Sequence, residues 1–128
     1  MTPPSRPSLA ITFLYYRDLA KAEAFYRDVL GLTLAIDQGW SKIFRIAEGA
    51  HIGLVDQDHG MNNWQTDKCV QICLRVADVD AWHDWANDQR LSNLSQMFQN
   101  DEIGIRAFVF EDPEGYQLEI QSPTREGA

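Results

Sequence analysis

The stretch FVFEDPEGYQLEIQ, from Phe108 to Gln121, reads as two strands joined by a tight turn. Its central DPEG favours a turn, because proline presets one backbone angle and glycine permits another. On the second strand Leu118 and Ile120 flank Glu119, whose charge is costly among apolar neighbours unless it is solvated, paired or bound to a ligand. The stretch therefore predicts a β-hairpin and raises the question of what Glu119 faces.

A strand followed by a helix occurs twice along the chain. LAITFLYYRDLAKAEAFYRDVLGL (residues 9–32) and KCVQICLRVADVDAWHDWANDQRL (68–91) each begin with a strand-like run and continue, after an Asp, with apolar residues at helical spacing. Asp18 and Asp78, 60 positions apart, are placed to cap the two helices, and Gly31 can end the first helix in a left-handed turn.

The ends of the two halves match as well. FRIAEGAHIGL (44–54) corresponds to FEDPEGYQLEI (110–120) at an offset of 66, and the six additional residues fall within 91–107, between helix and hairpin. Each half thus predicts a strand, a helix and two or three antiparallel strands, and the two halves should share a core. We expect a flexible tail (1–8), one domain (9–122) made of a first module (about 9–55), a linker (56–68) and a second module (about 69–122), and a C-terminal tail (123–128).

Strand alternation sorts the side chains onto two faces. Away from the helix, the second half presents a polar set, Gln71, Cys73, Arg75, Gln117, Glu119 and Gln121, and the first half a mostly apolar set, Leu9, Ile11, Phe13, Tyr15, His51, Gly53 and Val55. A cavity with one polar and one apolar-aromatic wall is typical of a small-molecule pocket. We expect ligand contacts from Gln71, Arg75, Glu119, Phe13, Tyr15, Trp64 and His51.

Composition excludes other classes of partner. With 45% apolar and 23% charged residues, the 128-residue chain is typical of a globular protein, and its net charge of −8 argues against nucleic-acid binding. No apolar run is long enough for a membrane span, and MTPPSRPS at the start lacks the apolar core of a signal peptide, so we expect a cytoplasmic protein. Cys69 and Cys73, about 13 Å apart on one strand, are predicted to be free, buried thiols.

DLAKAEAFYRDVLGL and FVFEDPEGYQLEIQ, together with the internal repeat, resemble the vicinal oxygen chelate superfamily of glyoxalases, bleomycin-resistance proteins and extradiol dioxygenases. The resemblance covers about residues 9–122. It implies an α+β fold of two βαβββ modules, with mixed sheets curving round a central cavity. It also implies a homodimer, because relatives of this length usually pair.

The family's metal enzymes place ligands on the first and last strands of each module. By motif spacing, the corresponding positions are Ile11, Gln71, Gly53 and Glu119. Ile11 and Gly53 offer no donor atom, whereas catalytic transition-metal sites take three or four protein ligands. We therefore expect no metal or other cofactor, with a divalent metal as the alternative.

Two functions remain open for this sequence. The first is a metal-independent small-molecule binding protein that uses the cavity between the modules. The alternative is a glyoxalase-like lyase, isomerase or dioxygenase with a divergent site that retains Gln71 and Glu119. Glu119 is the candidate catalytic residue, as a general base whose pKa burial would raise, and the simpler interpretation is an ion pair with Arg75 or a hydrogen bond to Gln71.

Overall fold

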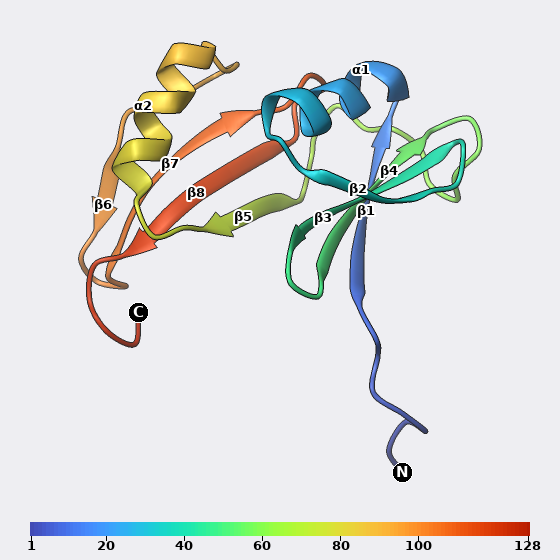
Figure 1. Cartoon of the computed structure of the whole chain (residues 1–128), viewed down its shortest axis with the longest axis horizontal. Helices are drawn as coiled ribbons and strands as arrows, with labels where there is room; N and C mark the ends of the chain where they lie inside the picture. Colours follow the sequence, from blue (N-terminus) through green and yellow to red (C-terminus); the bar gives the residue numbers. More distant parts are fainter. The chain divides into compact units, whose positions relative to one another are not determined.

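Strands and helices follow the same order in both halves of the computed structural model, which describes residues 1–128 (Figure 1). The chain divides into two units, Met1–Trp64 and Gln65–Ala128, here called module 1 and module 2. Module 1 contains β1 (Ala10–Tyr16), α1 (Leu19–Ala24), the π-helical turn η1 (Phe25–Val29), β2 (Thr33–Asp37), β3 (Ser41–Ala47) and β4 (Ala50–Asp56). Module 2 contains β5 (Gln71–Arg75), α2 (Val79–Gln89), β6 (Phe98–Asn100), β7 (Ile105–Glu111) and β8 (Gln117–Pro123).

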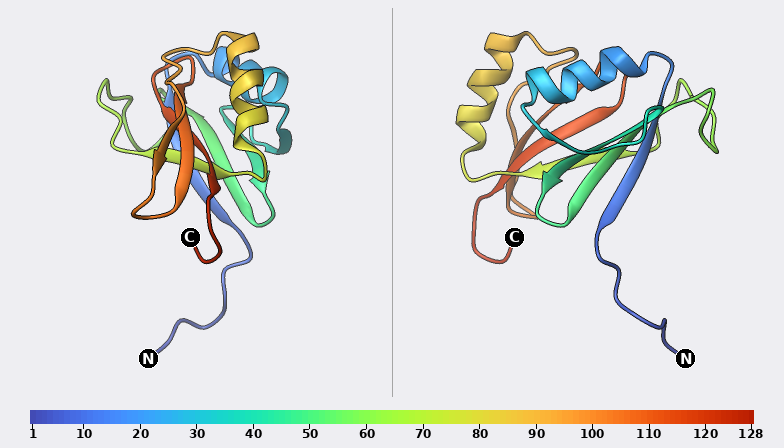
Figure 2. Two further views of the ribbon diagram at one scale, coloured as in Figure 1. Left: turned by 90° about the vertical axis from the view of Figure 1, so that its left-hand side faces the viewer. Right: turned by 45° about the vertical axis from the view of Figure 1, so that its right-hand side comes forward.

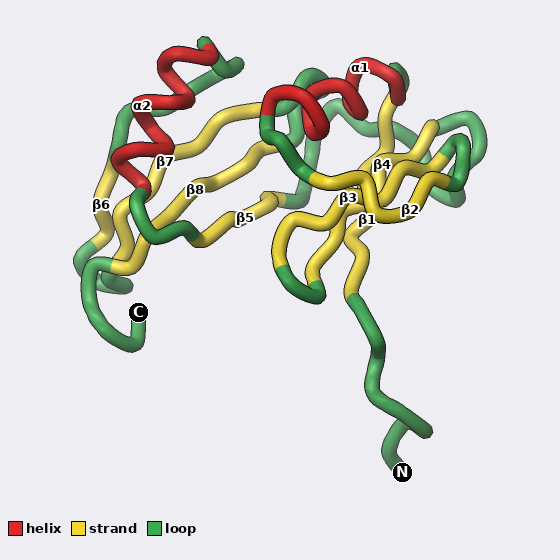
Figure 3. The backbone as a smooth tube through the Cα atoms, viewed as in Figure 1, coloured by secondary structure: helices red, strands yellow, loops and turns green.

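Each module forms one four-stranded mixed sheet with the same topology. The strand orders are β1-β4-β3-β2 and β5-β8-β7-β6. The first and last strands of each module pair in parallel, and the remaining pairs are antiparallel (Figures 1 and 3). The predicted α+β fold of two βαβββ modules is therefore confirmed. None of the helices combines the length and apolarity needed to cross a lipid bilayer.

Both helices begin at the predicted capping residues. The side chain of Asp18 accepts a hydrogen bond from the Lys21 amide, and that of Asp78 accepts one from the Ala81 amide, each at 3.1 Å. These carboxylates satisfy amides that have no partner within the first turn of a helix. Sequence spacing was sufficient to place both helix starts.

Replacing Asp78 with Ala is expected to lower the free energy of unfolding by about 1 kcal/mol, because the Ala81 amide loses its acceptor. Urea denaturation followed by circular dichroism measures the difference. Asp84→Ala, at an exposed position on the same helix, is the control and should change the value by less than about 0.5 kcal/mol. Equal effects of the two substitutions would contradict the capping assignment.

The first helix departs from the regular form that its spacing predicts. After Ala24 it continues as the π-helical turn η1, in which the Leu30 amide donates to the carbonyl of Phe25. Gly31, with φ of +68°, then ends the helix as expected. Tyr26, within this turn, is fully buried, and its hydroxyl lies 3.3 Å from that of Tyr16.

The helix-facing side of each sheet carries the core. Buried side chains in module 1 include Leu14, Tyr16, Tyr26, Phe44, Ile52 and Leu54, and those in module 2 include Ile72, Phe108, Phe110, Leu118 and Ile120. Buried and more exposed residues alternate along β5 and the second half of β1, as predicted, whereas β4 is buried continuously from Ile52 to Val55. Helix α1 packs on β4, and α2 packs on β7 and β8 (Figure 2). The candidate site residues consequently lie on the open faces.

Candidate functional site

Module 1 has a small pocket on the open face of its sheet. It has a volume of about 140 Å³ and is lined by Phe13, Tyr15, Gln38, Trp40, Ser41, Val55, Gly60 and Met61. Phe13 and Trp40 are both 46% exposed, although large aromatic side chains gain from burial. The structure thus brings two of the predicted apolar contacts, Phe13 and Tyr15, into one pocket.

The pocket lining includes a buried hydroxyl group, that of Ser41. Ser41 is 2% exposed, and its Oγ atom has no hydrogen-bond partner in the protein. Beside it in the sequence, Trp40 stacks on His59 with 5.8 Å between ring centroids and 14° between planes. A ligand polar atom that reached Ser41 would satisfy a group that is costly to leave unpaired.

Gly60 closes one side of the pocket without a side chain. A Cβ atom added there would lie 2.6 Å from the Tyr15 ring and 2.7 Å from Val55. The close approach of this backbone segment therefore depends on glycine. The sequence analysis did not predict that Gly60 and Met61 line the pocket, because neither residue belongs to a recognisable motif.

His51 and Trp64, the other predicted contacts of the first half, do not line this pocket. His51 lies on β4 opposite Ile11, and its Nδ1 atom is buried without a hydrogen-bond partner. The guanidinium carbon of Arg17 lies 3.8 Å from the centroid of the Trp64 ring. One face of Trp64 is thus covered by a cation of the chain itself.

In module 1, the two positions that correspond to metal ligands in the resembling family, Ile11 and Gly53, are surrounded by hydrocarbon groups. A Cβ atom added at Gly53 would lie 2.5 Å from the ring of Phe13 and 3.3 Å from Ile11. The ring therefore occupies the space that a side chain at Gly53 would need. The protein has no group of three or more His, Cys, Asp or Glu side chains placed to hold a metal ion.

On module 2 the predicted polar residues form a row across the parallel pair β5–β8. The register places Gln71, Cys73 and Arg75 opposite Gln117, Glu119 and Gln121, respectively. Gln71 Nε2 donates to Gln117 Oε1 at 2.6 Å, and Cys73 Sγ lies 3.5 Å from Glu119 Oε2. Arg75 donates through Nε and Nη2 to Gln121 Oε1 at 3.0 and 2.7 Å.

Glu119 has different partners from those that the sequence analysis considered. Its Oε2 atom accepts hydrogen bonds from the amide of Gln121 and from the Cys73 thiol, not from Arg75 or Gln71. Gln121 therefore stands between the carboxylate and the guanidinium and hydrogen-bonds to both. Within module 2, the half-buried Glu119 carboxylate therefore faces the Gln121 amide and the Cys73 thiol and accepts a hydrogen bond from each.

The cysteines correct another expectation. Both are free, but both are exposed rather than buried. Partial desolvation and the neighbouring Glu119 carboxylate raise the pKa of the Cys73 thiol from 9.0 to about 11. The thiolate, which is the nucleophile, is therefore scarce near neutral pH.

Alkylation of Cys73 by iodoacetamide at pH 8 is expected to be slow, and Glu119→Gln should accelerate it severalfold by lowering the thiol pKa. The substitution removes the negative charge that opposes thiolate formation. Mass spectrometry of a Cys69→Ser background follows the reaction. Asp84→Ala is the control and should react at the rate of the parent. An unchanged rate in Glu119→Gln would show that the Glu119 charge does not raise the pKa of the Cys73 thiol.

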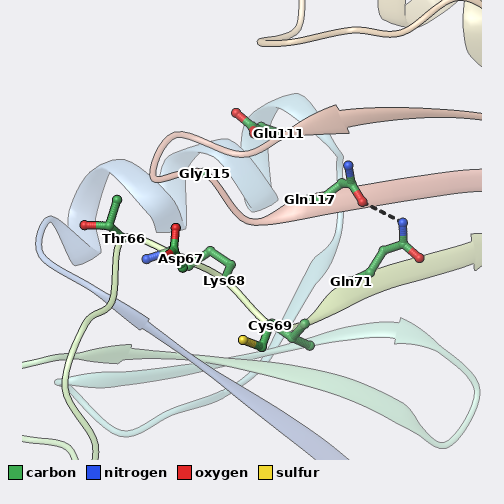
Figure 4. Close-up of a pocket in the computed structure, with 9 residues that line it drawn as sticks. Thr66, Asp67, Lys68, Cys69, Gln71, Glu111, Gly115 and Gln117 are labelled. Atoms are coloured by element: carbon green, nitrogen blue, oxygen red, sulfur yellow. Dashed lines mark hydrogen bonds between the residues drawn. The ribbon is translucent and has the colours of Figure 1, made fainter.

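Module 2 also contains a larger, polar pocket of about 410 Å³ beside the Gln71–Gln117 pair (Figure 4). It is lined by Thr66, Asp67, Lys68, Cys69, Val70, Gln71, Glu111, Gly115 and Gln117. Two of its three charged side chains, Glu111 and Lys68, have partners in the chain. Glu111 accepts from Asn93 at 2.6 Å, and the Lys68 ammonium donates to the Gln65 carbonyl and lies 4.8 Å from the Tyr116 ring centroid. The cavity predicted between the polar and apolar faces stays a prediction.

Comparisons with known proteins place this geometry in context. The family model of the Glyoxalase/Bleomycin resistance protein/Dioxygenase superfamily matches residues 8–120. No curated protein is significantly similar in sequence. Among solved structures, lactoylglutathione lyase from Agrobacterium tumefaciens is 24% identical, with a TM-score of 0.74 over 99% of this chain and 100% of that chain.

Two further solved structures have the same fold. A glyoxalase/bleomycin resistance protein/dioxygenase from Nocardioides is 18% identical, with a TM-score of 0.77 over 98% of this chain and 89% of its own. A fosfomycin resistance protein from Listeria monocytogenes is 18% identical, with a TM-score of 0.73 over 95% of this chain and 98% of its own. At these identities the likeness shows the fold, and function has to be argued from the site.

Proposed function

Since the chain belongs to the glyoxalase/bleomycin resistance protein/dioxygenase superfamily, we propose that it is a binding protein for a small organic molecule and acts without a metal ion. The observation that carries this proposal is the pocket of module 1, where exposed aromatic rings surround a buried hydroxyl without a protein partner. Pockets of this kind combine apolar contact area with a few orienting polar groups.

The size and lining of the pocket favour a single planar ring. An apolar cavity of about 150 Å³ holds benzene, and this pocket has a volume of about 140 Å³. A ring that covers Phe13 and Trp40 gains about 25 cal/mol for each Å² of apolar surface removed from water. A hydroxyl or carbonyl on that ring would pair with Ser41 Oγ and fix its orientation.

The donor groups at the four positions support the proposed metal independence. Phe13 fills the space beside Gly53, and Ile11 offers no ligand. Of the remaining two positions, Glu119 is engaged by Gln121 and Cys73, and Gln71 is engaged by Gln117. Two groups with these partners do not make the three- or four-ligand site of a catalytic transition metal. Gln71, Arg75 and Glu119 remain the proposed polar contacts for a ligand.

Phenol is the probe for the aromatic pocket, and titration is followed by amide chemical shifts of the full chain. We expect saturable shifts at β1 and β3, and binding at least tenfold weaker in Trp40→Ala. Trp82→Ala, whose ring packs against Trp85 on α2, is the matched control and should bind phenol as the parent does. Absence of saturation, or equal affinity in Trp40→Ala, would refute the proposal.

The buried hydroxyl makes a separate prediction. The parent should bind phenol about threefold to tenfold more tightly than toluene, because one hydrogen bond contributes about 0.5–1.5 kcal/mol. Ser41→Ala should abolish the preference and leave toluene binding unchanged. A preference that survives in Ser41→Ala would show that the ring is oriented by another group.

A homodimer in the cytoplasm, expected from the sequence, completes the proposal. Large apolar side chains exposed in module 1 outside the pocket, among them Leu9 and Ile36, would gain from being covered by a second copy. Light scattering should then give twice the chain mass of 14.6 kDa. A single-chain mass over a wide concentration range would contradict dimer formation.

A further inference from the structure

Arg45 has no partner in the protein. It is exposed on β3, and neither an ion pair nor a hydrogen bond holds its guanidinium. Lys42, on the same strand, is paired with Asp37 at 2.8 Å. Arg6 and Arg90 also lack partners, so this property alone does not identify a site.

The side chain opposite Arg45 distinguishes it from the other two arginines. In the antiparallel pair β3–β4 its register partner is His51, which is half-buried. Nδ1 of His51 is buried without a hydrogen-bond partner, and no group of the protein hydrogen-bonds to Nε2. Since the buried Nδ1 meets no acceptor, we expect the neutral ring to carry its proton on Nε2, which can donate it to a ligand. Two unpaired donors therefore lie side by side.

A third donor lies on the next strand of the sheet. Thr33 on β2 is the register partner of Arg45, is exposed, and has no hydrogen bond in the protein. Thr33, Arg45 and His51, here called the donor row, thus come from three neighbouring strands about 4.7–4.9 Å apart. On β1 the row ends at Ile11, the register partner of His51. The row contains no carboxylate, and its hydroxyl, guanidinium and imidazole suit an oxyanion.

The donor row and the aromatic pocket lie on the same face of the sheet. Along β3, Ser41, Ile43 and Arg45 alternate onto this face, so about 13 Å of strand separates the pocket hydroxyl from Arg45. Between them the ring of Phe13 occupies the space beside Gly53. An apolar surface therefore connects the two polar ends.

We propose that the donor row binds the carboxylate group of an aryl-alkyl acid, whose ring occupies the aromatic pocket and whose alkyl chain crosses Phe13. The inference rests on the proposed function and deepens it, because it names the class of ligand for the same face. A guanidinium matches a carboxylate through parallel N–H donors, and His51 Nε2 adds another. The net charge of −8 disfavours anions over the surface as a whole, so a preference for an acid requires a local site.

The test titrates the full chain at constant ionic strength with 6-phenylhexanoate and with its neutral amide, 6-phenylhexanamide. Amide chemical shifts and the Arg45 side-chain Nε–H signal follow binding. We expect saturable shifts at β1, β3 and β4, and binding of the acid at least tenfold tighter than that of the amide. Trp40→Ala should weaken both probes at least tenfold, because both place their ring in the pocket.

Variants of the donor row test which side chains read the carboxylate. Arg45→Gln should abolish the preference for the acid, Arg45→Lys should retain part of it, and His51→Gln should reduce it about threefold. Arg45→Gln should still bind phenol as the parent does, which shows that the pocket is intact. The matched control is Arg90→Gln, which removes the same charge from another unpaired arginine and should keep the full preference.

The outcomes separate this inference from the proposed function. If phenol binds the aromatic pocket but acid and amide bind equally, or the preference survives in Arg45→Gln, the carboxylate site is refuted and the binding function stands. If the preference depends on Arg45 while Trp40→Ala weakens neither phenol nor the acid, the carboxylate site stands and the aromatic pocket fails. If neither phenol nor the acid binds, both are refuted.

Discussion

Replacing Phe108 with Ala is expected to lower the free energy of unfolding of module 2 by about 3–5 kcal/mol, because a buried aromatic ring is removed and a cavity remains. Phe108 is fully buried on β7. Its ring contacts His83 of α2 edge to face, with 4.8 Å between centroids, and stacks near Phe110 at 6.2 Å. Loss of the ring therefore weakens the packing of the helix on the sheet.

Urea denaturation measures the loss in free energy of unfolding, and amide hydrogen exchange of β7 and β8 shows whether the loss occurs in module 2. The matched control is Phe98→Ala, since Phe98 lies on the short strand β6 and is 41% exposed. We expect the control to change the free energy of unfolding by less than about 1 kcal/mol. A loss below 1 kcal/mol in Phe108→Ala would mean that the helix does not depend on this ring.

The fold was predictable because its determinants are local and occur twice. Asp18 and Asp78 cap their helices at the expected positions, and two-residue alternation matches the burial of β5 and of the second half of β1. Capping and alternation depend on residues within a few positions of each other. The repeat then supplied the long-range information, because a match at a fixed offset implies two copies of one supersecondary unit.

The pocket could be predicted only in part. Phe13 and Tyr15 followed from the alternation of β1. Gly60 and Met61 come from the segment after β4, which reaches β1 by tertiary folding. No periodicity encodes such an approach, and its one signal is the glycine that allows the backbone to contact Tyr15.

The burial of Cys73 was misjudged because residue type was given too much weight. Cysteine is commonly buried, yet alternation already placed Cys73 on the polar face, where the structure finds it exposed. His83 on α2 shows the opposite case, since this polar side chain is half-buried against Phe108 and its Nε2 lies 3.0 Å from the Ser95 carbonyl oxygen. In both cases the position on the element decided the environment.

Asp112 organises the hairpin turn that leads into β8. It is 2% exposed, and its Oδ1 atom accepts hydrogen bonds from the amides of Glu114 and Tyr116 at 2.9 and 3.0 Å. Its own amide donates to the Tyr116 carbonyl at 2.9 Å, and Gly115 supplies the positive φ of 93° that the turn requires. The carboxylate thus holds the turn that sets β8 in register with β7.

Asp112→Ala is expected to lower the free energy of unfolding by about 3 kcal/mol, because two amides, one of them fully buried, lose a charged acceptor. Asp112→Asn retains a side-chain oxygen for both amides and should lose less than half as much. Urea denaturation measures both, with Asp88→Ala, an exposed position on α2, as the control, whose change should be near zero.

In Asp112→Ala, the turn amides should also exchange with solvent at least tenfold faster. The Arg75 Nε–H signal should shift because its hydrogen-bond partner Gln121 lies on the strand that the turn positions. If Asn and Ala prove equally destabilising, the oxygen acceptor is not what stabilises the hairpin, and its link to the polar row is wrong.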